Sequence, residues 1–256
     1  MIITKGLLTH NEIYFASPKD FNDPFDCRIT ERYIGRSEEE LKKYKREFAE
    51  VHKDDNELKG LTFEEIIKKL DHVSKDIEAF QKRSEETHFK MQDEWYGVLS
   101  LSETWDNILM WSHYSNNHKG FCVGINGESL LAFANYSSSK GGKVFYEKEY
   151  PDLDLRVSRN MNQMEIVKRA FDETHTKAKA WCYEKEYRIT KNFMGENPIQ
   201  RIDSLPANSI VEIILGIAID EIDKEEILKV ARQKGIKVFQ AQKIPFKFEI
   251  KREQII

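Results

Sequence analysis

Apolar residues recur at helical spacing between residues 37 and 94, and charged residues fill most positions between them. Ser37 with Glu40 has the spacing of a capping box, and Thr62 with Glu65 repeats it. An apolar face follows each pair, first Leu41, Tyr44, Phe48 and Val51, then Ile66, Leu70, Val73, Ile77 and Phe80. Spacings of three and four residues put side chains on one side of a helix. The segment is therefore expected to form two long helices, most economically as an antiparallel hairpin.

The rest of the chain alternates short apolar runs with polar turns. Strands are expected at residues 12–16, 98–102, 120–125, 143–146, 186–190, 210–215, 236–240 and 246–251. Helices are expected at residues 105–116, 161–179 and 223–233, the last with Asp223 as N-cap and Gly235 after its end. This mixture lacks a strict βαβ rhythm, so the predicted fold class is α+β with a mixed or antiparallel sheet. We expect a single domain over residues 1–256, with 37–94 as an inserted hairpin.

Charge is concentrated in and around the predicted hairpin. Residues 31–94 hold 14 basic and 18 acidic residues in 64 positions, whereas the other 192 residues hold 26 of each sign. The whole net charge of −4 therefore lies in this segment. A solvated helical insertion that packs on a core is the simpler interpretation, and a partner-binding or dimerising hairpin is the alternative.

Composition excludes several classes of protein. Of the 256 residues, 33% are charged and 11% are aromatic, and so many aromatic residues favour a folded chain over a disordered one. The sequence pI near 6.0 gives no general nucleic-acid footprint. No apolar run approaches a membrane span, and the N-terminus lacks a signal peptide's features, so we expect no membrane partner. The three cysteines form no CxxC motif, which argues against a disulfide framework or a zinc site and favours a cytoplasmic location.

Three clusters place polar residues among aromatic ones. The first, residues 17–27, contains the turn signal Asn22-Asp23-Pro24, and Phe21 and Phe25 on either side are expected to anchor it in the core. Such a loop either presents Asn22, Asp23 and Asp26 at a cleft or is an Asx turn with no ligand.

The second cluster, residues 107–120, is expected to place Met110, Trp111 and Tyr114 close together on a helix, with His113 beside them. Asn116, Asn117, His118 and Lys119 then form a polar stop before Gly120. Aromatic faces beside hydrogen-bond donors suit an anionic or nucleotide ligand. His113 is equally well explained as a hydrogen-bonded structural histidine.

The third cluster is Lys179–Ile189. If its strand begins near Glu184, then Glu184, Glu186 and Arg188 share one face, because side chains alternate along a strand. Two carboxylates and a guanidinium on one face form either a surface ladder of ion pairs or a site in which the pKa values of the carboxyl groups are tuned.

In order and spacing these clusters resemble one bacterial family, the domain-of-unknown-function 2971 family. The matching elements are Phe21–Asp26, Trp111–Tyr114 with His118–Gly120, and the pattern Trp-x-x-Glu-x-Glu-x-Arg at 181–188. The resemblance covers roughly residues 10–190 and implies a role in phage defence and abortive infection.

More distantly, Glu184-Lys185-Glu186 looks like the Glu-x-Glu element of mono-ADP-ribosyltransferases. That resemblance implies NAD as substrate, Glu186 as catalytic carboxylate, Glu184 as its helper and His113 as a further catalytic candidate. The implied ligand-binding residues are Asn22, Asp23, Trp111, Tyr114, His118, Lys119 and Arg188, with Tyr114 or Trp111 stacking on nicotinamide.

Two other classes of function stay open. One is a non-enzymatic module that binds a nucleotide, or a protein through the hairpin at 37–94. The other is a metal-dependent nuclease built on Asp23, Asp26 and Glu186, which ranks last because no compact metal-binding spacing supports it. No metal cofactor is indicated.

Overall fold

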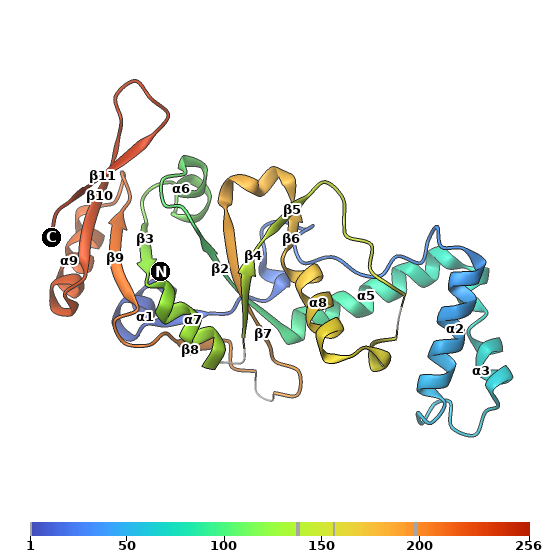
Figure 1. Ribbon diagram of the computed structural model, residues 1–256. Coiled ribbons are helices and arrows are strands. Elements are labelled where there is room, and N and C mark those ends of the chain that lie inside the picture. The colour runs from blue at the N-terminus through green and yellow to red at the C-terminus, as the bar shows by residue number, and fades with distance from the viewer. Residues whose placement is uncertain (1, 137–138, 156, 197–198) are drawn as a thin grey trace. The chain divides into compact units, whose positions relative to one another are not determined.

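The structure, a computed structural model, describes residues 2–136, 139–155, 157–196 and 199–256, and it confirms the α+β class (Figure 1). Its α-helices are α1 Ile2–His10, α2 Glu38–His52, α3 Phe63–Lys69, α4 His72–Lys75, α5 Ile77–Trp95, α6 Ile108–Tyr114, α7 Gly127–Tyr136, α8 Gln163–Thr174 and α9 Glu221–Lys234. Its short 3₁₀ helices are η1 Pro18–Asp20, η2 Ser158–Asn160 and η3 Lys179–Glu184. Its strands are β1 Glu12–Tyr14, β2 Tyr96–Ser102, β3 Phe121–Ile125, β4 Lys140–Lys143, β5 Phe145–Glu147, β6 Thr176–Ala178, β7 Glu186–Asn192, β8 Ile202–Ser204, β9 Ile210–Leu215, β10 Lys237–Lys243 and β11 Ile250–Gln254.

The chain divides into two compact units. The first comprises Met1–Asp20, Trp95–Val144 and Ala180–Ile256, and the second comprises Phe21–Glu94 and Phe145–Lys179. The predicted insertion 37–94 thus shares its unit with the residues just before it and with a later segment. The expectation of a single domain stays a prediction. Among the described residues, no helix is both long and apolar enough to cross a membrane.

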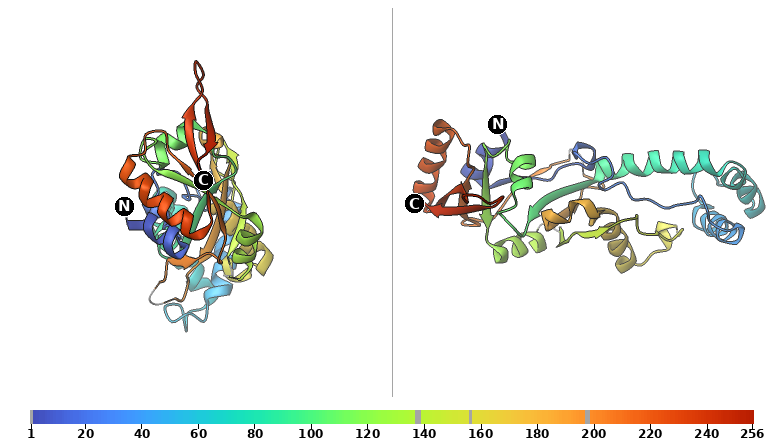
Figure 2. Two further views of the ribbon diagram at one scale, coloured as in Figure 1. Left: turned by 90° about the vertical axis from the view of Figure 1, so that its left-hand side faces the viewer. Right: turned by 90° about the horizontal axis from the view of Figure 1, so that it is seen from above.

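A four-stranded sheet of order β11-β10-β9-β3 forms one part of the first unit. β9 pairs antiparallel with β3 and parallel with β10, and α9 makes the crossover between these parallel strands. Figure 2 shows α9 lying beside this sheet. Its Ile227, Leu228 and Ala231 are buried against the sheet's Ile213 and Val238. The face of the sheet beneath α9 is therefore shielded from solvent.

A second, three-stranded sheet of order β2-β7-β4 carries the third sequence cluster. β7 lies in its centre and pairs antiparallel with both neighbours, and Ser102 of β2 lies opposite Glu186. Ile189 of β7 is fully buried beside Phe15 and Phe193. β1 pairs with β8, and an isolated bridge links Ala16 to Val98. The start of β7, which carries Glu186, is thus held between two strands.

In the second unit, α2 and α3 lie at one end of the long helix α5 (Figures 1 and 2). Both predicted capping boxes are present, and the predicted apolar faces meet in one core of Tyr33, Leu41, Tyr44, Leu70, Val73, Ile77, Phe80 and Leu155. The expected second helix, however, is broken into α3, α4 and α5. Leu70 ends α3, and Asp76 accepts a hydrogen bond from the Ala79 backbone at 3.0 Å as α5 begins. Such local side-chain bonds compete with an uninterrupted helix.

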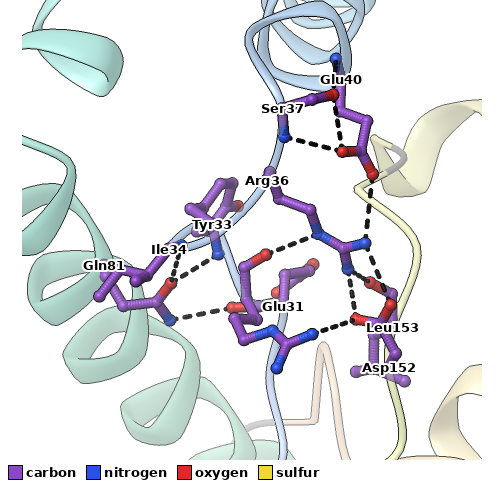
Figure 3. A network of polar contacts seen from close by, with 10 residues as sticks. Glu31, Tyr33, Ile34, Arg36, Ser37, Glu40, Gln81, Asp152 and Leu153 are labelled. Atoms are coloured by element: carbon purple, nitrogen blue, oxygen red, sulfur yellow. Dashed lines mark hydrogen bonds and ion pairs between the residues drawn. The ribbon is translucent and has the colours of Figure 1, made fainter.

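Figure 3 shows the polar network around the start of α2. The side chain of Gln81 on α5 accepts from the Tyr33 backbone N–H at 2.6 Å and donates to the Glu31 carbonyl at 3.0 Å. Arg36 reaches Asp152 with two guanidinium nitrogens and donates to the Leu153 carbonyl at 3.0 Å. These bonds tie the segment that precedes α2 to α5 on one side and to the segment after β5 on the other.

Several element boundaries differ from prediction. Residues 161–179 form α8 and then β6, because the helix ends at its C-cap His175. Asp220 and not Asp223 caps α9, by accepting a hydrogen bond from the Asp223 backbone at 2.9 Å. Gly235 ends that helix with a φ of 67°, as expected. The last strand begins at Ile250, so Phe246–Glu249 lies in a turn. Sequence analysis did not predict α1, α7 or β8.

Candidate functional site

Helix α6 is positioned by Asn107. Its side-chain oxygen accepts from the backbone N–H groups of Leu109 and Met110, which makes it the N-cap, and its amide donates to the Tyr183 carbonyl at 3.3 Å. Tyr183 lies in η3, just before the Glu-x-Glu element. One side chain therefore both starts the helix of the second cluster and ties it to the third cluster.

Tyr114, the last residue of α6, contacts the third cluster directly. Its hydroxyl donates to Oε1 of Glu184 at 2.6 Å, across 70 positions of sequence. Glu184 is only 2% exposed, whereas Tyr114 is 52% exposed. The Ser102 hydroxyl donates to the Glu184 carbonyl at 2.7 Å and fixes the backbone there. A buried carboxylate is thus connected to an aromatic ring that is about half exposed to solvent.

Three further rings, those of His113, Trp181 and Tyr183, lie beside this contact. The rings of His113 and Trp181 are 6.3 Å apart in an edge-on arrangement, and Trp181 is 6.0 Å from Tyr183. His113 is exposed, and its ring also lies edge-on to that of Tyr114 at 6.2 Å. The second and third clusters therefore meet within the first unit, as a ligand site built from both would require.

Glu186 and Arg188 form a two-point ion pair at the start of β7. The Arg188 guanidinium donates from Nε at 2.7 Å to one carboxylate oxygen and from Nη2 at 3.0 Å to the other. The side chains are 5% and 1% exposed. The prediction that these two residues share a strand face is confirmed, and the guanidinium fixes the orientation of the carboxylate.

Glu184 does not share that face, contrary to prediction. It is the last residue of η3, and Lys185 between the two glutamates has a φ of 44°. This left-handed residue breaks the alternation that a continuous strand would impose. The two carboxylates therefore have separate surroundings, Glu184 with Tyr114 and Glu186 with Arg188.

The other aromatic candidate, Trp111, is buried. Its indole N–H donates to the Trp105 carbonyl at 2.6 Å, and it packs with Ile214, Ala241 and Ile250. It stacks on the His118 ring at 6.3 Å. Of the two rings predicted to face a ligand, only that of Tyr114 is largely exposed.

The polar stop after α6 is a left-handed turn. Asn116, Asn117 and His118 all have positive φ, between 50° and 65°, and Lys119 is exposed. The turn is fixed against the sheet because the Ala218 N–H donates to the His118 carbonyl at 3.0 Å. Gly216 is required beside it, since a Cβ there would lie 2.2 Å from that carbonyl oxygen. The geometry gives His118 a structural role.

Residues 21–27 of the first cluster belong to the second unit. Asp23 is buried and its carboxylate accepts from the Phe25 N–H at 2.9 Å, so the predicted Asx turn is present, with Asn22 exposed. Asp26 is buried and pairs with Lys177 at 3.5 Å. The expectation that Phe25 anchors the turn is wrong, because its side chain is 66% exposed. The Asp23 hydrogen bond and the Asp26–Lys177 ion pair hold the loop in place, although the Phe25 ring is not buried.

Ser102 and Asn107 were not predicted from the sequence as positioning residues. Asn107 had a usable signal, since an asparagine before an apolar helical run is a good N-cap. Ser102 had none, because its bond to Glu184 spans 82 positions. Among the described residues, no group of three or more His, Cys, Asp or Glu side chains is arranged to hold a metal ion.

Comparison with known proteins bears on the same segment. Residues 110–189 match the family model described as "protein of unknown function (DUF2971)". The match begins in α6 and ends in β7, so it contains both halves of the Tyr114–Glu184 contact. No curated protein and no solved structure matches the chain. The resemblance drawn from the sequence motifs is confirmed over residues 110–189, which match the model of the domain-of-unknown-function 2971 family.

Proposed function

We propose that this protein is an NAD-consuming effector, an ADP-ribosyltransferase or NAD glycohydrolase that serves bacterial anti-phage defence of the abortive-infection type. The hydrogen bond from Tyr114 to Glu184 carries the proposal. It joins the ring suited to stack on nicotinamide to the Glu-x-Glu element that resembles the catalytic element of ADP-ribosyltransferases. Both residues lie in the segment that matches the family.

The proposed chemistry breaks the bond between nicotinamide and C1′ of its ribose. The bonding electron pair leaves with nicotinamide and neutralises the positive charge of its ring, while positive charge develops on the ribose. A fixed carboxylate beside that charge stabilises the transition state more than the ground state. Water or an acceptor side chain then adds to C1′ and gives up a proton.

In this proposal Glu186 is the carboxylate that faces the ribose, and Arg188 is a positioning residue that holds both of its oxygens. Glu184 is also a positioning residue, because its contact orients the phenol of Tyr114. Exposed His113, whose ring lies edge-on to those of Tyr114 and Trp181, would orient the substrate in this proposal. Asn22 and Asp23, in the second unit, stay predicted ligand-binding residues.

The test is release of nicotinamide from NAD by the purified chain, with and without bacterial cell extract. Glu186→Gln is expected to lower the rate about 100-fold or more, by loss of charge stabilisation. Tyr114→Phe keeps the ring and loses the bond to Glu184, so a loss of roughly tenfold is expected. Glu225→Gln, an exposed glutamate on α9, is the matched control and is expected to leave the rate unchanged. Equal rates for the wild type and Glu186→Gln would refute the proposal.

A second function, binding of a partner protein, is favoured by one observation. An open groove of about 630 Å³ runs along α2 and is lined by Phe63, at the start of α3, and by Glu39, Lys42, Lys43, Arg46, Glu47 and Glu50. If the protein acts as a non-enzymatic module, Lys43→Glu with Arg46→Glu should abolish its effect in phage-challenged cells while Glu186→Gln leaves it intact. If Glu186→Gln abolishes the effect in cells while the Lys43→Glu and Arg46→Glu variant keeps it, the result supports the enzymatic function.

A further inference from the structure

The turn between β10 and β11 presents two phenylalanines. The Lys247 N–H donates to the Ile244 carbonyl at 3.2 Å, which closes a four-residue turn with Pro245 and Phe246 at its centre. The Ile244 N–H donates to the Glu249 carbonyl at 3.0 Å and continues the hairpin ladder. Proline suits the first central position of such a turn because its φ is already fixed near the required value.

Phe246 has a φ of 63°, which places it in the left-handed region. The second central position of a type II turn requires positive φ and is normally glycine or asparagine, because a bulky side chain strains the backbone there. Folding alone would therefore favour a different residue. A phenylalanine kept in this conformation points to a use for its ring.

The rings of Phe246 and Phe248 are exposed and do not pack in the protein's core. Their exposures are 108% and 95%, higher than those of any other large apolar side chain among the described residues. Figures 1 and 2 show the hairpin projecting beyond the sheet to which its strands belong. Both rings therefore face solvent in the turn that joins the two strands.

Positive charge surrounds the two rings. Lys243, Lys247 and Lys251 are exposed on the hairpin, and the acidic residue among them is Glu249, 3.9 Å from Lys247. Three lysines against one glutamate leave a local charge of +2 at residues 243–251. The chain as a whole carries −4, so the tip differs in sign from the rest of the molecule.

We propose that this hairpin tip docks on the surface of an anionic lipid bilayer, with Phe246 and Phe248 inserted at the interface. Aromatic rings favour that zone, and lysines spread their apolar stems there while their ammonium groups meet lipid phosphates. One apolar anchor gives marginal binding, and an apolar anchor combined with basic residues gives stable binding. This attachment is peripheral and requires no membrane-spanning helix, but it departs from the expectation that the protein has no membrane partner. It is also independent of the proposed NAD chemistry.

The test is co-sedimentation of the full chain with vesicles of phosphatidylcholine containing phosphatidylglycerol, compared with phosphatidylcholine alone. The wild type should bind the anionic vesicles, and Phe246→Ser with Phe248→Ser should reduce binding about tenfold or more. Lys243→Gln with Lys247→Gln and Lys251→Gln should remove the preference for anionic lipid, as should high salt. Ile222→Ser on α9, another exposed apolar residue at 76%, is the matched control and should bind normally.

A phenylalanine-to-tryptophan change reports insertion directly. The emission of Phe246→Trp should shift to the blue when anionic vesicles are added, and thermal unfolding should match the wild type, because the tip contributes nothing to the core. Absence of vesicle binding by the wild type would overturn the proposal, and so would full binding by the double serine variant. Binding of a labelled single-stranded oligonucleotide through these phenylalanines, with no vesicle binding, would also overturn it and would assign the rings to base stacking.

Discussion

Loss of the Glu186–Arg188 pair has a stability cost that follows from its burial. Both side chains are almost fully buried, and two hydrogen bonds of 2.7 and 3.0 Å join them. Arg188→Met leaves the Glu186 carboxylate buried without its guanidinium, and Glu186→Leu leaves the guanidinium without its carboxylate. Breaking a buried pair in this way costs about 3–5 kcal/mol. Each single variant is therefore expected to lose about that much free energy of unfolding.

The double variant is expected to be more stable than the sum of the single losses predicts. Glu186→Leu with Arg188→Met removes both charges together, so neither is left unpaired, and apolar replacement of a whole buried pair is often close to neutral. A coupling free energy of at least about 2 kcal/mol should result. The matched control is Lys191→Met on the same strand, because the Lys191–Asp203 pair is longer, at 3.6 Å, and more exposed. Loss of the Lys191–Asp203 pair should lower the free energy of unfolding by less than about 1 kcal/mol.

Tryptophan fluorescence during urea unfolding measures these changes selectively. All four tryptophans lie in the first unit, which also contains the pair. Thermal midpoints should fall by roughly 6–20 °C in the single variants, using about 2–4 °C per kcal/mol. Additive losses in the double variant would refute the reasoning, because they would show that the two charges do not depend on each other.

Three further predictions concern groups outside this pair. Burial, the largest cause, raises the pKa of the Cys122 thiol to about 11, so at pH 8 the exposed Cys182 should react with a disulfide reagent many times faster, and Cys182→Ser should remove the fast phase. Burial, the largest single cause, lowers the pKa of His88, but the Glu173 carboxylate, 3.5 Å from Nε2, outweighs burial and leaves the pKa raised. A raised folded-state pKa stabilises the fold below the unfolded value and loses that effect as pH rises through the folded value. Unfolding monitored by circular dichroism should therefore show stability falling as pH rises above the ordinary histidine pKa, and His88→Gln should flatten that dependence. Ser37→Ala removes the N-cap of α2 and should cost about 0.5–2 kcal/mol in the same assay, while Ser37→Asp should cost much less; equal losses would contradict a capping role.

Much of the local structure was predictable because its causes lie within a few residues of each other. Residue spacing alone predicts both capping boxes and the apolar faces of the helical segment. It also predicts the glycine that ends α9, Gly235, and the strand face that Glu186 and Arg188 share. The apolar spacing runs without interruption through the break between α3 and α5 and so did not predict it; the Asp76 side chain accepts a hydrogen bond from the Ala79 backbone where α5 begins.

The sequence by itself determined the α+β class, the likeness of residues 110–189 to one family and the chemical types present in the candidate site. Tertiary structure decided which of those residues meet. It connected Tyr114 to Glu184 across 70 positions, buried Trp111, and separated Glu184 from the strand face of Glu186 through the left-handed Lys185. It also turned an expected strand into an exposed tip at Phe246. Periodicity encodes which way a side chain faces within one element, but contact between elements depends on backbone geometry and packing that no local pattern contains.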